Sequence, residues 1–199
     1  MEKLRLAFSL FVVVFVFSSW KARSENKSAT LEAKRPDGLT AWERVYSVLT
    51  SPRCVNCHTA TNYPQQGDDR HRHFANVVRG PEGKGVPALQ CATCHQAANA
   101  DSTGVPGAQG WHLAPLSMRW QDRNDKPLPS AAVCRSLKSQ NVDLIKHHSE
   151  EPLVLWGFTS GLRPDGTART LPPLTHAEFL EATRRWVEAD KPCPTGGQR

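Results

Sequence analysis

The pattern CxxCH occurs twice in this chain, as CVNCH at residues 54–58 and as CATCH at residues 91–95. In each copy two thiols lie about one helical turn apart, and a histidine follows the second thiol directly. Such a pair of thiols can add to the two vinyl groups of a haem, after which the adjoining imidazole binds the iron. The sequence therefore predicts two haem c groups in one chain. The predicted attachment residues are Cys54, Cys57, Cys91 and Cys94, and the predicted proximal iron ligands are His58 and His95.

Two other uses of paired cysteines fit the pattern less well. A zinc site made of two CxxC pairs usually has about 15–20 residues between the pairs, whereas residues 58–90 separate them here. Zinc would also leave the histidine after each pair unexplained. A CxxC disulfide is typical of a redox centre on a thioredoxin-like βαβ pattern, which this sequence lacks. Haem attachment accounts for all six residues.

Residues 1–24 have the three parts of an export signal. A basic start is followed by an apolar run from Leu6 to Phe17, and Ala22-Arg23-Ser24 supplies a small-x-small cleavage site. The apolar run is shorter than the roughly 20 residues of a membrane span, and an uncleaved anchor is the alternative. We expect export, in a bacterium to the periplasm, with no membrane span after the signal is removed. Residues 25–35 are polar and lack periodicity, so we expect a flexible leader.

Charge and length indicate which partners and which domain organisation to expect. The formal charge of +6 falls to +3 when residues 1–24 are removed, and the chain has no stripe of Lys and Arg with interleaved aromatic residues. Nucleic acid is therefore not an expected partner. The rest of the chain suits one domain, residues 36–199. With 15 prolines and 13 glycines it gains little from side-chain burial alone. The expected fold is mainly α, with short helices and long loops packed around two covalent haems.

Helices are expected at both ends of the domain. Thr40 opens a capping box, and the apolar residues of 42–49 follow at helical spacing. Thr175 opens a second capping box, ahead of an amphipathic helix that ends before Pro192. The elements expected between them are short helices after Ser130 and after Asn141 and an extended segment over residues 153–158.

A long connection follows each CxxCH motif. Residues 59–90 and 99–130 are rich in Pro, Gly and charged residues, and loops of this length inside a compact domain are usually functional. The motifs and their connections form a loose duplication with an offset of 37 residues. Each connection offers side chains that could reach an iron from the side opposite its proximal histidine.

The CxxCH motif leaves the second axial ligand of each iron open. Met118 is the one methionine besides Met1, so at most one iron can have a methionine ligand, and core packing is the alternative use of this side chain. His73 lies in a loop that can reach across the first haem. His147 and His148 are adjacent candidates on a predicted short helix, and helical spacing turns His148 toward its apolar face.

Two cysteines remain outside the CxxCH motifs. Cys134 lies in a predicted short helix and Cys193 lies just beyond the last one. Neither has the spacing of a metal ligand. In an exported protein we expect them to form a disulfide that ties the C-terminus to the body of the domain.

Six segments between residues 39 and 194 carry a resemblance to a known family. They are SPRCVNCH, GDDRHRHFANVVRG, CATCHQAAN, WHLAPLSM, KHHSEEPLVLWGF and WVEADKPCP. Together they resemble small exported bacterial dihaem c-type cytochromes, a group loosely labelled isoquinoline 1-oxidoreductase subunit. In that family the histidine at the position of His147 recurs while position 148 varies, which differs from the preference of helical spacing. The label implies association with a molybdenum hydroxylase that passes on electrons.

These features predict an electron carrier rather than an enzyme. We expect one-electron transfer between an exported dehydrogenase or oxidase, such as a molybdenum hydroxylase, and a downstream acceptor. A methionine ligand tends to raise the potential of a haem, so His/Met ligation at one iron would make the two haems unlike. The alternative is a dihaem peroxidase, in which one iron lacks a distal protein ligand. A haem-based sensor or a docking subunit is a third class.

Overall fold

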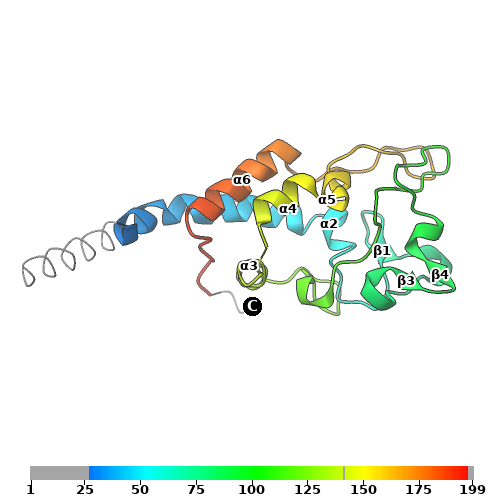
Figure 1. The fold of residues 1–199 in the computed structure, drawn as a ribbon, viewed down its shortest axis with the longest axis horizontal. Helices are drawn as coiled ribbons and strands as arrows, with labels where there is room; N and C mark the ends of the chain where they lie inside the picture. The colour runs from blue at the N-terminus through cyan, green and yellow to red at the C-terminus, as the bar shows by residue number, and fades with distance from the viewer. Residues whose placement is uncertain (1–26, 141, 197–199) are drawn as a thin grey trace, which may run out of the picture.

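The computed structural model describes residues 27–140 and 142–196. The predicted export signal and the helix start predicted at Asn141 lie outside these residues. The described chain is rich in helix, as expected, and its strands are only two residues long. The longer helices gather in one half of the molecule, and the connections after the CxxCH motifs make up the other half (Figure 1). Nowhere in these two ranges is a helix both long and apolar enough to cross a bilayer.

The first helix covers residues 27–49 of the described chain. The short elements that follow are α2 (Pro52–Val55), β1 (Gln65–Gln66), β2 (His71–Arg72), η1 (Phe74–Asn76), η2 (Pro81–Gly83), β3 (Gly85–Val86), β4 (Leu89–Gln90), η3 (Cys91–Thr93) and η4 (Leu116–Met118), where η is a turn of 3-10 helix. The later helices are α3 (Ser130–Lys138), α4 (Leu144–Glu150), α5 (Pro152–Gly157) and α6 (His176–Glu188). β1 pairs with β2 and β3 with β4, both antiparallel.

The first helix begins earlier than the capping pattern predicts. Residues 27–39 are already helical, so the described part of the expected leader is helix and not flexible chain. Thr40 lies inside this helix, where its hydroxyl donates to the Pro36 carbonyl at 3.1 Å. The reason is composition, because the residues before Pro36 include Leu31, Glu32, Ala33 and Lys34, which are all good helix formers.

One apolar core holds the helical half together. Trp42 and Val45 of the first helix are fully buried against Phe179 and Trp186 of α6. The rings of Trp42 and Trp186 have centroids 4.7 Å apart. The capping box at Thr175 is present at the start of α6. The amphipathic patterns at both ends of the domain are therefore confirmed as helices that face the core.

The segment predicted to be extended is helical instead. Residues 152–157 form α5, with Pro152 at its first turn. An extended apolar segment must pair its backbone groups with another strand, and the two-residue strands of the described chain offer no such partner. A helix satisfies those groups internally, and Pro is well suited to its first turn. The short helix predicted after Ser130 is present as α3, but Ser130 is its first residue and Pro129 takes the cap position.

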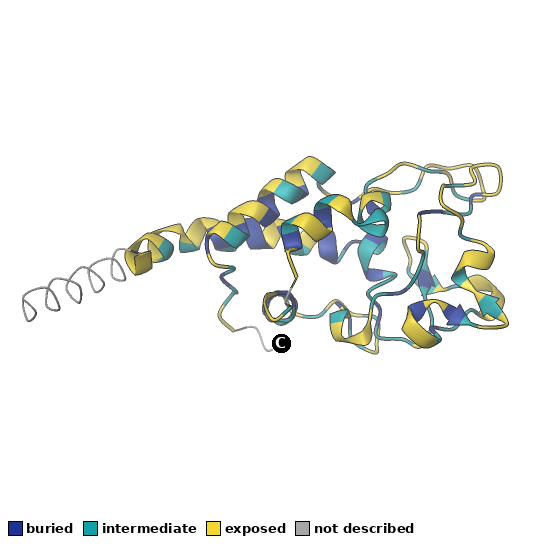
Figure 2. Cartoon of the chain, in the orientation of Figure 1, coloured by how far each residue is buried: buried dark blue, intermediate teal, exposed yellow. Residues whose placement is uncertain are grey.

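The half that contains the connections buries few apolar side chains. Between Asn56 and Arg119 the buried hydrophobic residues are Ala108 and Leu113, and most of this half is exposed or intermediate in Figure 2. Backbone segments pack closely against each other there. At Gly85, for example, a side chain would not fit, because its Cβ would lie 2.5 Å from the Leu89 carbonyl oxygen. Burial this sparse offsets little of the entropy lost when the chain is ordered. This half therefore needs a further source of packing.

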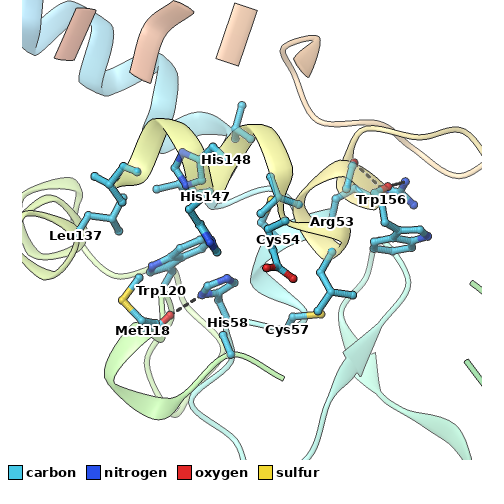
Figure 3. Close-up of a pocket in the computed structure, with 18 of the residues that line it drawn as sticks. Arg53, Cys54, Cys57, His58, Met118, Trp120, Leu137, His147, His148 and Trp156 are labelled. Atoms are coloured by element: carbon cyan, nitrogen blue, oxygen red, sulfur yellow. Dashed lines mark hydrogen bonds between the residues drawn. The ribbon is translucent and has the colours of Figure 1, made fainter. Parts of the chain in front are cut away.

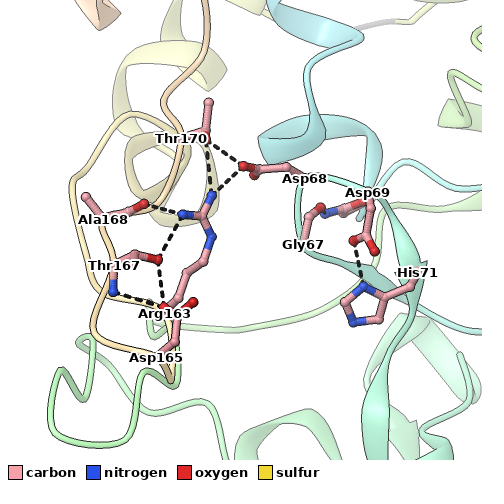
Figure 4. A network of polar contacts seen from close by, with 10 residues as sticks. Gly67, Asp68, Asp69, His71, Arg163, Asp165, Thr167, Ala168 and Thr170 are labelled. Carbon is pink, nitrogen blue, oxygen red and sulfur yellow. Dashed lines mark hydrogen bonds and ion pairs between the residues drawn. The ribbon is translucent and has the colours of Figure 1, made fainter.

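A polar network fastens two loops of the same half. Arg163 donates to the carboxylate of Asp68 and, at 3.1 Å, to the hydroxyl of Thr170 (Figure 4). The Thr170 hydroxyl donates to the same carboxylate at 2.5 Å. Because Asp68 lies between β1 and β2, the network holds the β1–β2 hairpin against the loop that joins α5 to α6.

The predicted disulfide is confirmed. Cys134 and Cys193 are bonded across a sequence separation of 59 residues, which ties α3 to the segment after α6. The four cysteines of the CxxCH motifs are free. The chain thus separates its cysteines into one structural pair and two pairs of free thiols.

Replacing Cys134 and Cys193 together by alanine is expected to lower the free energy of unfolding by about 2–4 kcal/mol, because the disulfide restricts the unfolded chain. Urea unfolding followed by far-UV circular dichroism measures this loss. Ser139→Ala, which removes an exposed hydrogen bond at the end of α3, is the control and should change little. A loss below about 0.5 kcal/mol for the double variant would contradict the prediction.

Candidate functional site

The two CxxCH motifs share one pair of backbone hydrogen bonds. In residues 54–58 the amides of the second cysteine and the histidine donate to the carbonyl of the first cysteine at 3.2 and 3.1 Å. In residues 91–95 the same two bonds measure 3.2 and 2.9 Å. This tight turn brings two thiols and one imidazole together at each motif. The duplication seen in the sequence is therefore also present in the local backbone structure.

Each CxxCH histidine is held through the same ring nitrogen. His58 Nδ1 donates to the Met118 carbonyl at 2.6 Å, and His95 Nδ1 donates to the Pro106 carbonyl at 2.7 Å. A carbonyl oxygen only accepts, so the proton is on Nδ1 and the lone pair is on Nε2. A histidine that binds a metal through Nε2 is usually held in this way.

A tryptophan ring stacks on each of these imidazoles. The centroids of His58 and Trp120 lie 3.4 Å apart with planes 5° from parallel, and those of His95 and Trp111 lie 4.3 Å apart at 3°. A flat contact limits rotation of the imidazole and leaves its edge, with Nε2, uncovered. These contacts cannot be predicted from the sequence pattern. Both tryptophans come from residues 99–130, and no local spacing relates Trp120 to His58.

A cavity of about 350 Å³ lies beside the first motif. Cys54, Cys57 and His58 line one side of it, and α4 and α5 cover another (Figure 3). The volume falls within the range of about 300–1,000 Å³ for ligand sites. Apolar side chains make up much of the wall, among them Val48, Leu49, Leu144, Leu153, Val154, Phe158 and Phe179. Two thiols, an oriented imidazole and apolar walls fit a covalently attached haem.

Two adjacent histidines of α4 line this cavity. His148 is buried and packs against Phe179, with ring centroids 4.8 Å apart. Burial lowers the pKa of His148 to about 3, so this imidazole is neutral. His147 is exposed and points from α4 toward His58 and Trp120 (Figure 3). Helical spacing is therefore right about which histidine is buried, while His147 is the one that faces His58.

Met118 is attached to the His58 side of the cavity. Its carbonyl accepts the His58 hydrogen bond, and its side chain packs against the apolar core. If His58 held an iron, a residue whose backbone binds this imidazole would be poorly placed to reach the opposite side of that iron. The Met118 side chain also lines the cavity, so its use as a distal ligand stays a prediction.

His73 lies beside the second motif, whereas the sequence analysis expected it to reach across the first. Its ring centroid is 5.9 Å from that of His95. The β1–β2 hairpin turns the chain back before His73, and the turn directs it toward His95. The preceding histidine, His71, binds the Asp69 carboxylate through Nδ1 at 2.6 Å instead.

Burial keeps the groups of the first motif uncharged. It raises the pKa of Cys54 to about 11. Burial, with smaller contributions from the neighbouring thiols of Cys54 and Cys91, raises the pKa of Cys57 to about 12. It lowers the pKa of His58 to about 4. At neutral pH the thiols are protonated and the imidazole is neutral.

Arg53, directly before the first motif, fastens α5 over the cavity. Its guanidinium donates to the Gly157 and Trp156 carbonyls at 3.0 and 2.9 Å and also to the Thr159 carbonyl. The same group lies 4.1 Å from the centroid of the Trp156 ring (Figure 3). One buried cation thus satisfies three carbonyls at the end of α5.

Within the part of the chain that the structure describes, no three His, Cys, Asp or Glu side chains gather as a bare metal site. A haem supplies four nitrogen ligands itself and needs only one or two from the protein. Comparison of the chain with protein-family models, curated proteins and solved structures finds no match.

Arg53→Met is expected to lower the free energy of unfolding by about 2–4 kcal/mol, because it keeps the aliphatic stem but removes a donor from the buried Gly157 carbonyl and from the Trp156 and Thr159 carbonyls. Chemical denaturation measures the loss. The matched control is Arg44→Met, which removes a half-exposed guanidinium 3.9 Å from Glu178 and should cost less than about 1 kcal/mol. Equal losses for the two variants would show that the Arg53 contacts do not stabilise the fold.

Proposed function

We propose that this chain is an exported dihaem c-type cytochrome that transfers single electrons between an exported dehydrogenase or oxidase and a downstream acceptor. The observation that carries the proposal is the repeated arrangement at the two motifs. Each has two free thiols on one turn, and each has an imidazole whose Nδ1 is bound to a carbonyl. Because both features occur at both motifs, on different loops, they support the same function for the two motifs.

In this proposal different residues attach the two haems and bind their irons. Cys54 and Cys57 attach the first, and Cys91 and Cys94 attach the second. His58 and His95 bind the irons through Nε2, since Nδ1 of each is occupied. A bound haem c supplies an iron that cycles between the ferric and ferrous states. In this proposal the apolar walls of the first cavity exclude water from its iron.

We assign the distal position of the first iron to His147. This residue lines the cavity and points toward His58 (Figure 3), and its imidazole makes no hydrogen bond to the described residues. His148 serves packing, because its ring lies against Phe179 and its carbonyl binds His176 Nε2 at 2.8 Å. Histidine at this position agrees with the family resemblance. It also replaces the His/Met ligation that the sequence analysis considered.

The class of redox partner follows from the proposed electron transfer. Electrons must enter from a protein that oxidises a substrate outside the cytoplasm, and they must leave to a second redox protein. A molybdenum hydroxylase is one such donor. The periplasm is the proposed compartment because c-type haem is attached there and because the Cys134–Cys193 disulfide is stable in oxidising surroundings.

A pyridine haemochrome spectrum of the purified mature protein, together with its mass, is expected to give two c-type haems per chain. Cys54→Ser with Cys57→Ser should remove one haem, and Cys91→Ser with Cys94→Ser should remove the other. The unreduced, denatured wild type should contain no free thiol. Zero haem, or four free thiols, would overturn the proposal.

His147→Ala is expected to convert one of the two haems from low spin to high spin, because the first iron loses a ligand. His148→Ala should keep both haems low spin and instead lower stability by about 1–3 kcal/mol, and Met118→Leu should keep both low spin. Absorption and electron paramagnetic resonance spectra measure the spin states. A high-spin haem in the wild type that binds cyanide would favour the dihaem peroxidase alternative.

A further inference from the structure

We propose that His73 is the second axial ligand of the iron at the second motif, opposite His95. The inference rests on the proposed function and adds the ligand that CxxCH does not specify. It also gives the β1–β2 hairpin a purpose, because this hairpin delivers His73 to the second motif.

The separation of the two rings fits a shared metal. The ring centroids of His73 and His95 are 5.9 Å apart, and the ring planes are inclined by 69°. Two imidazoles that bind one metal from opposite sides have centroids about 6 Å apart, because each nitrogen–metal bond is about 2 Å and each centroid lies about 1 Å behind its nitrogen. The pair therefore has the spacing of two axial ligands before any metal is considered.

Both rings also have the required nitrogen free. His73 Nδ1 donates to the Phe74 carbonyl at 2.7 Å, just as His95 Nδ1 donates to the Pro106 carbonyl at 2.7 Å. The lone pair of each ring is therefore on Nε2, and neither Nε2 forms a hydrogen bond with the described residues. Both imidazoles are held as metal-binding histidines are held.

The loop that carries His73 is anchored on both sides. The His73 amide donates to the Pro64 carbonyl at 3.0 Å, and the Phe74 amide donates to the Gln66 side chain at 3.1 Å. The Asp68–Arg163 network fastens the tip of the same hairpin (Figure 4). A ligand held on an anchored loop keeps its position without a large loss of entropy on binding.

Ring contact separates His73 from its neighbours. His71 has Nδ1 bound to Asp69 and a buried Nε2 without a hydrogen-bond partner among the described residues, but its ring packs against Phe74, with ring centroids 5.0 Å apart. His112 lines the first cavity. Among the described histidines, His73 is the one whose ring contacts that of His95. With His147 at the first iron, both irons then have two histidine ligands.

The test compares His73→Ala, His73→Met and His71→Ala in the mature, haem-loaded protein. We expect two haems per chain in each variant by pyridine haemochrome. In His73→Ala one of the two haems should become high spin, and added imidazole should restore the low-spin spectrum. His73→Met should stay low spin with a raised potential at one haem. His71→Ala, the matched control from the same hairpin, should leave both spectra unchanged.

The wild type supplies a measurement that does not depend on the folding of a variant. Near-infrared magnetic circular dichroism is expected to report bis-histidine ligation for both haems. A His/Met or high-spin signature for the second haem would overturn the inference, as would two unchanged low-spin haems in His73→Ala. These outcomes leave the haem count at two, so they are distinct from the zero count that would overturn the proposed function.

Discussion

The structure depends on the hydrogen bond that joins each CxxCH imidazole to a backbone carbonyl. His58 is bound in this way to Met118, sixty positions further along the chain, and His95 is bound to Pro106. Each bond selects the tautomer, aims Nε2 and fixes a long connection against its motif. The stacked rings of Trp120 and Trp111 add a second restraint. On the proposed function, a loop whose backbone orients an iron ligand in this way is part of the site even where its own side chains do not face the metal.

The two halves of the molecule are stabilised by different means. The helical half has a core around Trp42 and Trp186 and a disulfide that closes it. The other half has two buried hydrophobic residues between Asn56 and Arg119, held among polar contacts and closely packed glycines. On the proposed function a haem supplies the apolar surface that this half lacks, so attachment of the second haem and folding of its loops are coupled. The cavity proposed for the first haem, in contrast, is partly formed by the helical core.

Local signals predicted the local features well. The capping box at Thr175, the apolar spacing of the first helix and the pairing of Cys134 with Cys193 are all present. The predictions that failed depend on the environment of a segment. Thr40 has the side chain of a cap but lies inside a helix that extends before it. Residues 153–157 are helical because no strand of the described chain lies beside them. The positions of His73, Trp111 and Trp120 depend on how the long connections fold back, and no periodicity encodes this.

The tryptophans near the first motif have an optical consequence. Trp111, Trp120 and Trp156 all line the cavity beside His58, and indoles emit light at wavelengths that a haem absorbs. On the proposed function, a chain that has not yet received its haem fluoresces, and the emission is lost by energy transfer as soon as the thioether bonds form. The chain thus contains its own reporter of maturation, which can be followed during biosynthesis without any added label.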